Sequence, residues 1–239
     1  MLAWNGYGDK DGNYAGISSI RVQDITKEGL AGAHLNCWMC GSGEYVLSAQ
    51  WTLDPNNQNG TSIYNRSIAD LRKLPAMQAG GVCTFDEAVP LLPAGATVVG
   101  EYGPCSSQAN PSPDNQKDTA KWLAHCAGLV GAGRFVQLTW QDAASLRAAS
   151  KAAQPGVRQL VCAPKEALAG VDVSKADIVA GDAHTYGQAD WAKLAGKRRT
   201  VWGYNARGRG DVEKAARGRK DAAAQPGTAL GDTRQEPAD

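Results

Sequence analysis

The feature that most constrains this chain is an alternation of short β-like runs with helix-like segments along almost its whole length. Parallel strands need a long crossover connection, usually a helix, so the alternation predicts a parallel sheet. Eight strands separated by helices in a chain of 239 residues fit a (β/α)8 TIM barrel of the α/β class. The predicted strands cover residues 2–4, 33–37, 45–49, 97–102, 135–140, 159–163, 178–181 and 200–204.

Side chains suited to capping mark the starts of two predicted helices. Ser67 is an expected N-cap, and Thr84 with Glu87 three positions later has the spacing of a capping box. An alanine-rich helix ends at the tripeptide QPG at 154–156, which is a strong stop signal. The predicted helices cover residues 17–27, 68–74, 85–92, 119–130, 143–153, 186–194 and 211–217.

The competing fold is a doubly wound sheet, which also alternates strands and helices. Dinucleotide-binding sheets of that kind carry G-x-G-x-x-G after the first strand, and neither GNYAG nor GLAGAH matches it. We therefore predict one barrel domain over residues 1–239, because barrels of this length are commonly single domains. Residues 104–118 are predicted to form a long polar loop on the C-terminal rim, where barrel sites are built. Residues 218–239 are predicted to form a closing turn and tail.

Composition limits the classes of partner. The formal net charge of +1 gives no reason to expect nucleic acid or an anionic membrane surface. No apolar run approaches the roughly 18 residues of a membrane-spanning helix. The start MLAWNGYGDKDG has no basic segment followed by a long apolar one, so we expect no signal peptide.

Several stretches of the chain share their order with the motifs of one known family. They are VLSAQWTLDPNNQNGTSIYNRSIADLRKL at 46–74, VCTFDEAVPLL at 82–92, TVVGEYG at 97–103, VWGYN at 201–205 and GTALGDTRQEP at 227–237. In this order they resemble the glycerophosphodiester phosphodiesterases, and the resemblance covers nearly the whole chain. The family consists of (β/α)8 barrels that hydrolyse glycerol-linked phosphodiesters with a divalent cation. The last stretch is similar to the family's closing turn, which predicts a packed final turn up to Pro237.

The resemblance implies a site whose acid/base histidines and metal-binding carboxylates are mostly absent here. Trp4 stands at the first histidine position and Ala49 at the second. His34 and Asn36 stand where two metal-binding acids are expected, and Glu101 is the carboxylate that matches. The vestigial site implied by the resemblance consists of Trp4, Asn5, Asn13, His34, Asn36, Ala49, Gln50, Glu101, Gly103 and Trp202.

These departures predict a barrel without catalytic residues. A lone Glu101 with neutral amide neighbours cannot supply the anionic cage that a hard cation needs. Loss of nearly all of an acting unit costs orders of magnitude in rate. We therefore expect no cofactor, and a residual activity would need Ca²⁺ or Mg²⁺ with Glu101 as a ligand.

Four cysteines are predicted to lie near the C-terminal rim: Cys37, Cys40, Cys83 and Cys105. Disulfides that brace the loops are the preferred interpretation. The alternatives are a tetrahedral zinc site and inert burial as small hydrophobic side chains.

Other chemistry-bearing residues have simpler interpretations. Cys126 and Cys162 are predicted core residues, and His184 is a predicted polar residue of the rim. The resemblance places Trp202 at the substrate-lining tryptophan of the eighth strand. One hypothesis is that aromatic side chains line an opening of the barrel suited to sugars or glycerol-like ligands. The preferred hypothesis is that these bulky side chains fill the space that the absent metal ligands would otherwise take. The aromatic residues concerned are Trp4, Trp38, Trp51, Tyr102, Trp140 and Trp202.

The predicted function is a non-catalytic structural or recognition protein. By analogy with degraded phosphodiesterase-like barrels, we expect a minor tail or tail-tip component of a phage virion. Its partners would be other tail proteins, and its ligand a glycan or phosphodiester of the host envelope. One alternative is an active metal-dependent phosphodiesterase with a site rebuilt from Glu101, His34 and His184 and a cysteine-bound metal. Another is a cytoplasmic binding protein for a phosphorylated metabolite.

Overall fold

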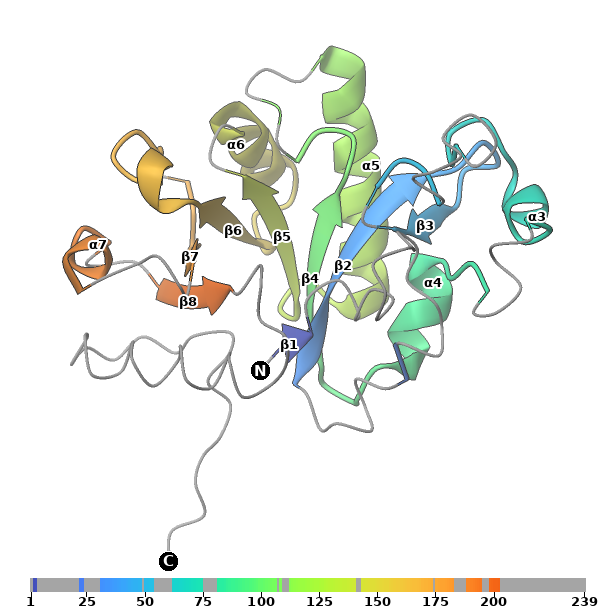
Figure 1. Cartoon of the computed structure of the whole chain (residues 1–239), viewed down its shortest axis with the longest axis horizontal. Coiled ribbons are helices and arrows are strands. Elements are labelled where there is room, and N and C mark those ends of the chain that lie inside the picture. The colour runs from blue at the N-terminus through green and yellow to red at the C-terminus, as the bar shows by residue number, and fades with distance from the viewer. Residues whose placement is uncertain are drawn as a thin grey trace, which may run out of the picture.

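The computed structural model describes eight strands that form one sheet (Figure 1). Along this sheet the order is β1-β2-β4-β5-β6-β7-β8, and β3 pairs with β2 outside the path. The strands are β1 (Leu2–Ala3), β2 (Gly32–Met39), β3 (Tyr45–Leu47), β4 (Thr97–Tyr102), β5 (Phe135–Trp140), β6 (Arg158–Ala163), β7 (Ile178–Asp182) and β8 (Arg198–Trp202). The structure describes residues 2–3, 22–23, 31–48, 50–53, 62–74, 81–106, 108, 112–140, 143–173, 175–182, 188–194 and 198–202.

Every pairing along the path from β1 to β8 is parallel. The two longest helices, α5 and α6, lie side by side; α5 packs on β4 and β5, and α6 on β6 (Figure 1). Parallel strands joined through outer helices confirm the predicted (β/α)8 barrel. The helices are α3 (Ile68–Leu71), α4 (Phe85–Ala88), α5 (Pro113–Val130), α6 (Ala144–Ala153) and α7 (Gln188–Ala192), with 3-10 helices η2 (Val89–Leu91) and η3 (Lys165–Ala167).

β3 departs from the predicted parallel pairing. It runs antiparallel to β2, with Trp38 opposite Val46. Residues 40–44 between the two strands are too few for a parallel crossover but sufficient for a hairpin. Gly43 makes the turn with a φ of 96°, which glycine adopts without a steric cost. Because β3 lies outside the path, β2 pairs directly with β4.

α5 begins earlier than predicted. Pro113 occupies its first position, and the side chain of Ser112 accepts a hydrogen bond from the backbone N–H of Asn115. Proline fits the first turn because its missing N–H would have no partner there. The predicted loop 104–118 was therefore wrong over 113–118, where polar and exposed residues continue the helix on its solvent side.

The capping predictions at α3 and α4 are confirmed. The Ser67 side chain accepts from the N–H of Asp70, and Thr84 and Glu87 make both hydrogen bonds of a capping box. Of the helix predicted at 17–27, the structure describes only 22–23 as helical. The helix predicted at 211–217 and the closing segment 218–239 lie outside the described residues. No helix of the described part is long and apolar enough to cross a membrane.

Successive residues of the strands face two different cores, as the two-residue period of a strand requires. On β4, Val99 belongs to the core inside the barrel, and Val98 belongs to the core between the sheet and the helices. Tyr102 belongs to this outer core and stacks on Trp122 of α5, with ring centroids 5.5 Å apart. The inner core contains Val99, Val136, Leu138, Leu160, Cys162, Ile178 and Ala180.

Arg147 of α6 is fully buried against the C-terminal end of β5. One guanidinium nitrogen donates to the Thr139 hydroxyl at 3.1 Å and to the Trp140 carbonyl at 2.9 Å. The other donates to the Asp172 carbonyl at 2.8 Å. The arginine therefore joins the end of β5 to the segment that follows η3.

Candidate functional site

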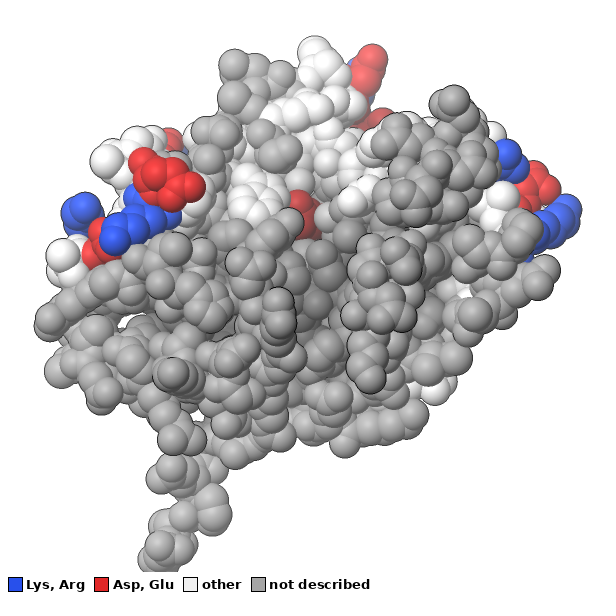
Figure 2. All heavy atoms as spheres, viewed as in Figure 1, with Lys and Arg blue, Asp and Glu red and all other residues white. Residues whose placement is uncertain are grey.

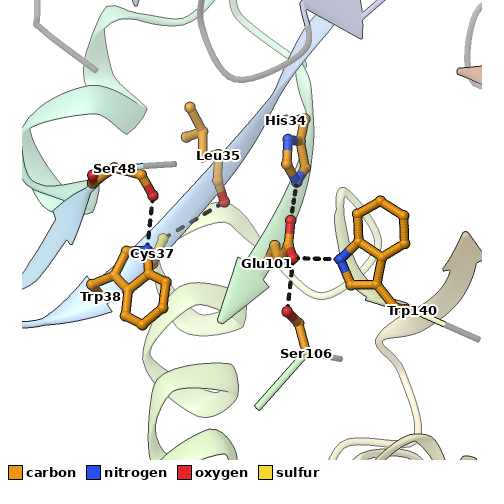
Figure 3. A network of polar contacts seen from close by, with 8 residues as sticks. All are labelled: His34, Leu35, Cys37, Trp38, Ser48, Glu101, Ser106 and Trp140. Carbon is orange, nitrogen blue, oxygen red and sulfur yellow. Dashed lines mark hydrogen bonds and ion pairs between the residues drawn. The ribbon is translucent and has the colours of Figure 1, made fainter. Parts of the chain in front are cut away.

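Glu101 lies inside the barrel near the C-terminal end of β4 and is 5% exposed. The Nε2 atom of His34, on β2, is 3.1 Å from Glu101 Oε2. Two donors reach the other oxygen, Oε1: the Ser106 hydroxyl at 2.7 Å and the indole N–H of Trp140 at 2.8 Å. Figure 3 shows these three side chains converging on the carboxylate from β2, from the turn after β4 and from the end of β5.

The electrostatics of Glu101 result from two opposing effects. Burial alone raises the pKa of this carboxyl, because a charged form loses its hydration. The contacts with His34, Ser106 and Trp140 outweigh burial and hold the pKa below its ordinary value. Glu101 is therefore a carboxylate at neutral pH, and it is stabilised by donors that belong to the protein.

The pairing of β2 with β4 explains why His34 and Glu101 meet. With β3 outside the path, Asn36 lies directly opposite Glu101 in the parallel register, and His34 lies opposite Val99. Asn36 is buried as well, and within the described part of the chain its amide oxygen accepts no hydrogen bond. The two residues expected at acidic positions thus face the same side of the sheet as Glu101.

Trp38 fills the space beside Gly103. A Cβ atom at position 103 would lie 2.1 Å from the indole ring of Trp38, a distance that real Cβ contacts do not show. The indole N–H donates to the Ser48 carbonyl at 2.9 Å (Figure 3). The ring also meets Tyr64 edge-on with centroids 5.7 Å apart. The lysine that the resemblance implies at 103 has no room here.

The fold and this geometry can be compared with known proteins. No protein-family model and no curated protein matches the sequence. A phosphodiesterase from Oleispira antarctica, solved in complex with the product sn-glycerol-3-phosphate, is 14% identical with a TM-score of 0.66, and the match covers 96% of this chain and 92% of that chain. A glycerophosphodiester phosphodiesterase from Thermotoga maritima is 12% identical with a TM-score of 0.64, covering 91% and 89%. A glycerophosphoryl diester phosphodiesterase domain from Mycobacterium tuberculosis is 13% identical with a TM-score of 0.61, covering 90% and 91%.

This chain has the glycerophosphodiester phosphodiesterase fold. At identities of 12–14% the likeness concerns the path of the backbone and not the residues of the site. The fold that the sequence resemblance implied is therefore confirmed. What this particular phosphodiesterase-fold barrel does depends on the side chains described above.

The donor set at Glu101 does not fit the divalent cation that the sequence resemblance implies. A hard cation is bound through several oxygen ligands, usually including more than one carboxylate together with carbonyl oxygens or waters. Glu101 instead faces an indole N–H, which cannot coordinate a metal, and an imidazole nitrogen. Among the described residues, no group of three or more His, Cys, Asp or Glu side chains is placed to hold a metal ion.

The cysteines do not form the bracing disulfides that were predicted, because all six are free and buried. Cys37, Cys83 and Cys105 belong to the core between the sheet and the helices, and Cys40 belongs to a separate cluster under the β2–β3 hairpin. Strand alternation explains the position of Cys37, because Asn36 beside it already faces the barrel interior. Cys126 and Cys162 are fully buried core residues, as predicted.

The thiols of the outer core are held in the protonated form. Burial raises the pKa of Cys83 to about 12. Burial also raises the pKa of Cys105 to about 11, although a hydrogen bond with the Thr119 hydroxyl opposes the shift. Since the thiolate is both the nucleophile and the metal ligand, these cysteines are poorly suited to either role.

The predicted aromatic opening is only partly formed by the described residues. Tyr102 faces α5 and not the barrel interior, so its inclusion was wrong. Trp38 and Trp140 are half-buried beside the Glu101 site, and Trp51 is 40% exposed. Trp202 ends β8 opposite Asp182 of β7.

The remaining predicted site residues are dispersed or undescribed. Gln50 is exposed, and its backbone N–H donates to the Ser48 hydroxyl. Trp4, Asn5, Asn13, Ala49 and His184 lie outside the described residues.

Sequence reasoning missed two of the three partners of Glu101. Ser106 was hidden in a stretch taken as a polar loop, although it follows Glu101 by five residues. Trp140 was considered only as an aromatic surface. Its N–H was a usable signal, because a buried tryptophan N–H usually finds an acceptor.

Proposed function

We propose that this chain is a non-catalytic recognition or structural protein built on a glycerophosphodiester phosphodiesterase barrel. The observation that carries the proposal is the burial of His34. This imidazole is 1% exposed and lies against the Glu101 carboxylate. A general acid or base must come within hydrogen-bonding reach of the substrate, whereas this imidazole is directed at Glu101.

The other histidines do not supply the missing acid/base pair in the described structure. The sequence contains three histidines. His125 lies on α5, outside the barrel, and its Nε2 atom is 2.9 Å from Asp86. His184 is not among the described residues. The alternative of a rebuilt hydrolytic site therefore has its two described members, His34 and Glu101, bound to one another and enclosed.

The charged side chains that Figure 2 shows lie in groups of both signs and form no patch of a single sign on this face. Ion pairs such as Lys73–Asp70 and Lys193–Asp190 bring opposite charges together on the described surface. Two exposed aromatic side chains offer an uncharged surface for recognition. Tyr64 and Trp51 are 41% and 40% exposed, and Trp51 accepts a backbone hydrogen bond from the residue before Tyr64. Exposed aromatic rings of this kind suit a glycan of a cell envelope.

The narrower assignment, a minor tail or tail-tip component of a phage virion, remains part of the proposal by analogy. It requires that the chain assemble with other virion proteins. Mass spectrometry of purified virions tests it, with stoichiometric detection as the expected result and absence from intact particles as the refuting one.

The hydrolysis assay tests the main proposal. Purified protein is incubated with glycerophosphocholine and, in separate samples, Mg²⁺, Ca²⁺ or Zn²⁺, and released glycerol 3-phosphate is measured. We expect no turnover above the blank. Glu166→Gln, which changes an exposed glutamate of η3, is the matched control for Glu101→Gln. Turnover that Glu101→Gln abolishes and Glu166→Gln preserves would overturn the proposal.

A further inference from the structure

The Glu101 carboxylate is satisfied from within the protein. A carboxylate has two oxygens with about four acceptor sites. Ser106 and Trp140 occupy Oε1, and His34 faces Oε2. A backbone hydrogen bond from the Trp140 N–H to the Ser106 carbonyl at 2.8 Å ties these two donors to each other. The donors are therefore part of a fixed frame and not loose side chains.

A cation at Glu101 would have to displace these donors. The indole N–H of Trp140 carries no lone pair that could turn toward a metal. The Nε2 atom of His34 lies 3.1 Å from Oε2, the oxygen that a cation would bind, so the imidazole would have to move aside. Asn36, which lies opposite Glu101 in the register, offers only a neutral amide oxygen.

We propose that the His34 imidazole occupies the place beside Glu101 that a metal ion would need, and that the site therefore excludes divalent cations. This inference goes beyond the absence of hydrolysis. A protein without hydrolytic activity could still bind a cation, and an active one could work without a cation. The hydrolysis assay and the cation-binding experiment therefore test the two proposals independently.

The proposal predicts that a carboxylate at position 34 creates a cation site. His34→Glu would place a second buried anion beside Glu101, where like charges destabilise one another unless a cation lies between them. Adding Asn36→Asp would supply a third carboxylate from the facing position on β2. His34→Gln is the matched control, because it also removes the imidazole but adds no charge.

The experiment measures thermal unfolding and tryptophan fluorescence in EDTA and with Ca²⁺ or Mn²⁺. We expect no response from the wild-type protein. For His34→Glu, we expect a lower melting temperature in EDTA and a rise of about 5–10 °C when the cation is about 100-fold above its Kd. His34→Gln should be destabilised without a cation-dependent rise.

Two results would overturn the proposal. One is a wild-type cation response that Glu101→Gln abolishes. The other is a folded His34→Glu protein, alone or with Asn36→Asp, that gains no cation response. If the His34 variants do not fold, the comparison of wild type with Glu101→Gln by Mn²⁺ electron paramagnetic resonance decides the question alone.

Discussion

Two buried charges lie on opposite sides of the end of β5 and are held in different ways. Inside the barrel, Glu101 is bound by side chains from three separate parts of the chain, including the indole N–H of Trp140. Outside it, Arg147 is bound mainly by backbone carbonyls, including that of Trp140. Side-chain partners can be exchanged one substitution at a time, whereas carbonyls stay wherever the backbone runs. Single substitutions can therefore alter the surroundings of Glu101. Those of Arg147 depend mainly on the backbone and are part of the scaffold of the barrel.

The largest expected effect comes from removing the outer charge. Arg147→Leu leaves the Trp140 and Asp172 carbonyls and the Thr139 hydroxyl without their donor, which should lower the free energy of unfolding by about 3–5 kcal/mol. Urea unfolding measures this loss. Arg147→Lys keeps the charge with fewer donors and should fall between wild type and Arg147→Leu. If Arg147→Leu lost less unfolding free energy than Glu101→Gln, the distinction between a structural Arg147 and an exchangeable Glu101 site would be wrong.

A smaller, pH-dependent effect is expected for the inner charge. Glu101→Gln should cost about 2 kcal/mol at pH 7, because hydrogen bonds to a charged acceptor are lost. The pKa of Glu101 lies below its ordinary value of 4.5, so its stabilisation is fully present above that pH and is lost as the pH falls through the lowered pKa. The difference in unfolding free energy between wild type and Glu101→Gln should therefore shrink below pH 4.5.

Subtracting the two unfolding curves isolates Glu101 together with His34, which is in contact with it, because the carboxylates elsewhere are common to both proteins. Urea titrations at a series of pH values provide the data. A difference that stays constant as the pH falls would show that the charge of Glu101 contributes nothing to the folded state.

The smallest effect is expected from a single donor. Ser106→Ala removes one of the two hydrogen bonds to Oε1 but keeps the backbone bond between the Ser106 carbonyl and the Trp140 N–H. We expect a loss of about 1–2 kcal/mol in urea unfolding. Lys121→Ala, which changes an exposed residue of α5 with a surface ion pair to Asp118, is the control and should have little effect. Equal losses for both variants would argue against a fixed frame around Glu101.

Most of the fold could be predicted because its signals lie within a few residues of one another. The site was harder to predict because the residues that contact Glu101 are far apart in the sequence. The caps at Ser67 and Thr84 are short-range chemistry that the sequence displays directly. The hairpin of β3 was also within reach, because the short link 40–44 allows only antiparallel pairing. Trp140 and Glu101 are 39 residues apart, and only the barrel brings them together. Strand alternation could have separated Tyr102 from Glu101, since adjacent strand residues face opposite sides.

The contact between Trp38 and Gly103 makes the two positions interdependent. A side chain larger than hydrogen at position 103 would need the space that the indole ring occupies. Making that space by shortening Trp38 would remove its hydrogen bond to Ser48 and its ring contact with Tyr64. The effects of substitutions at 38 and 103 should therefore be non-additive, so that a residue tolerated at 103 beside a small side chain at 38 would be excluded beside tryptophan.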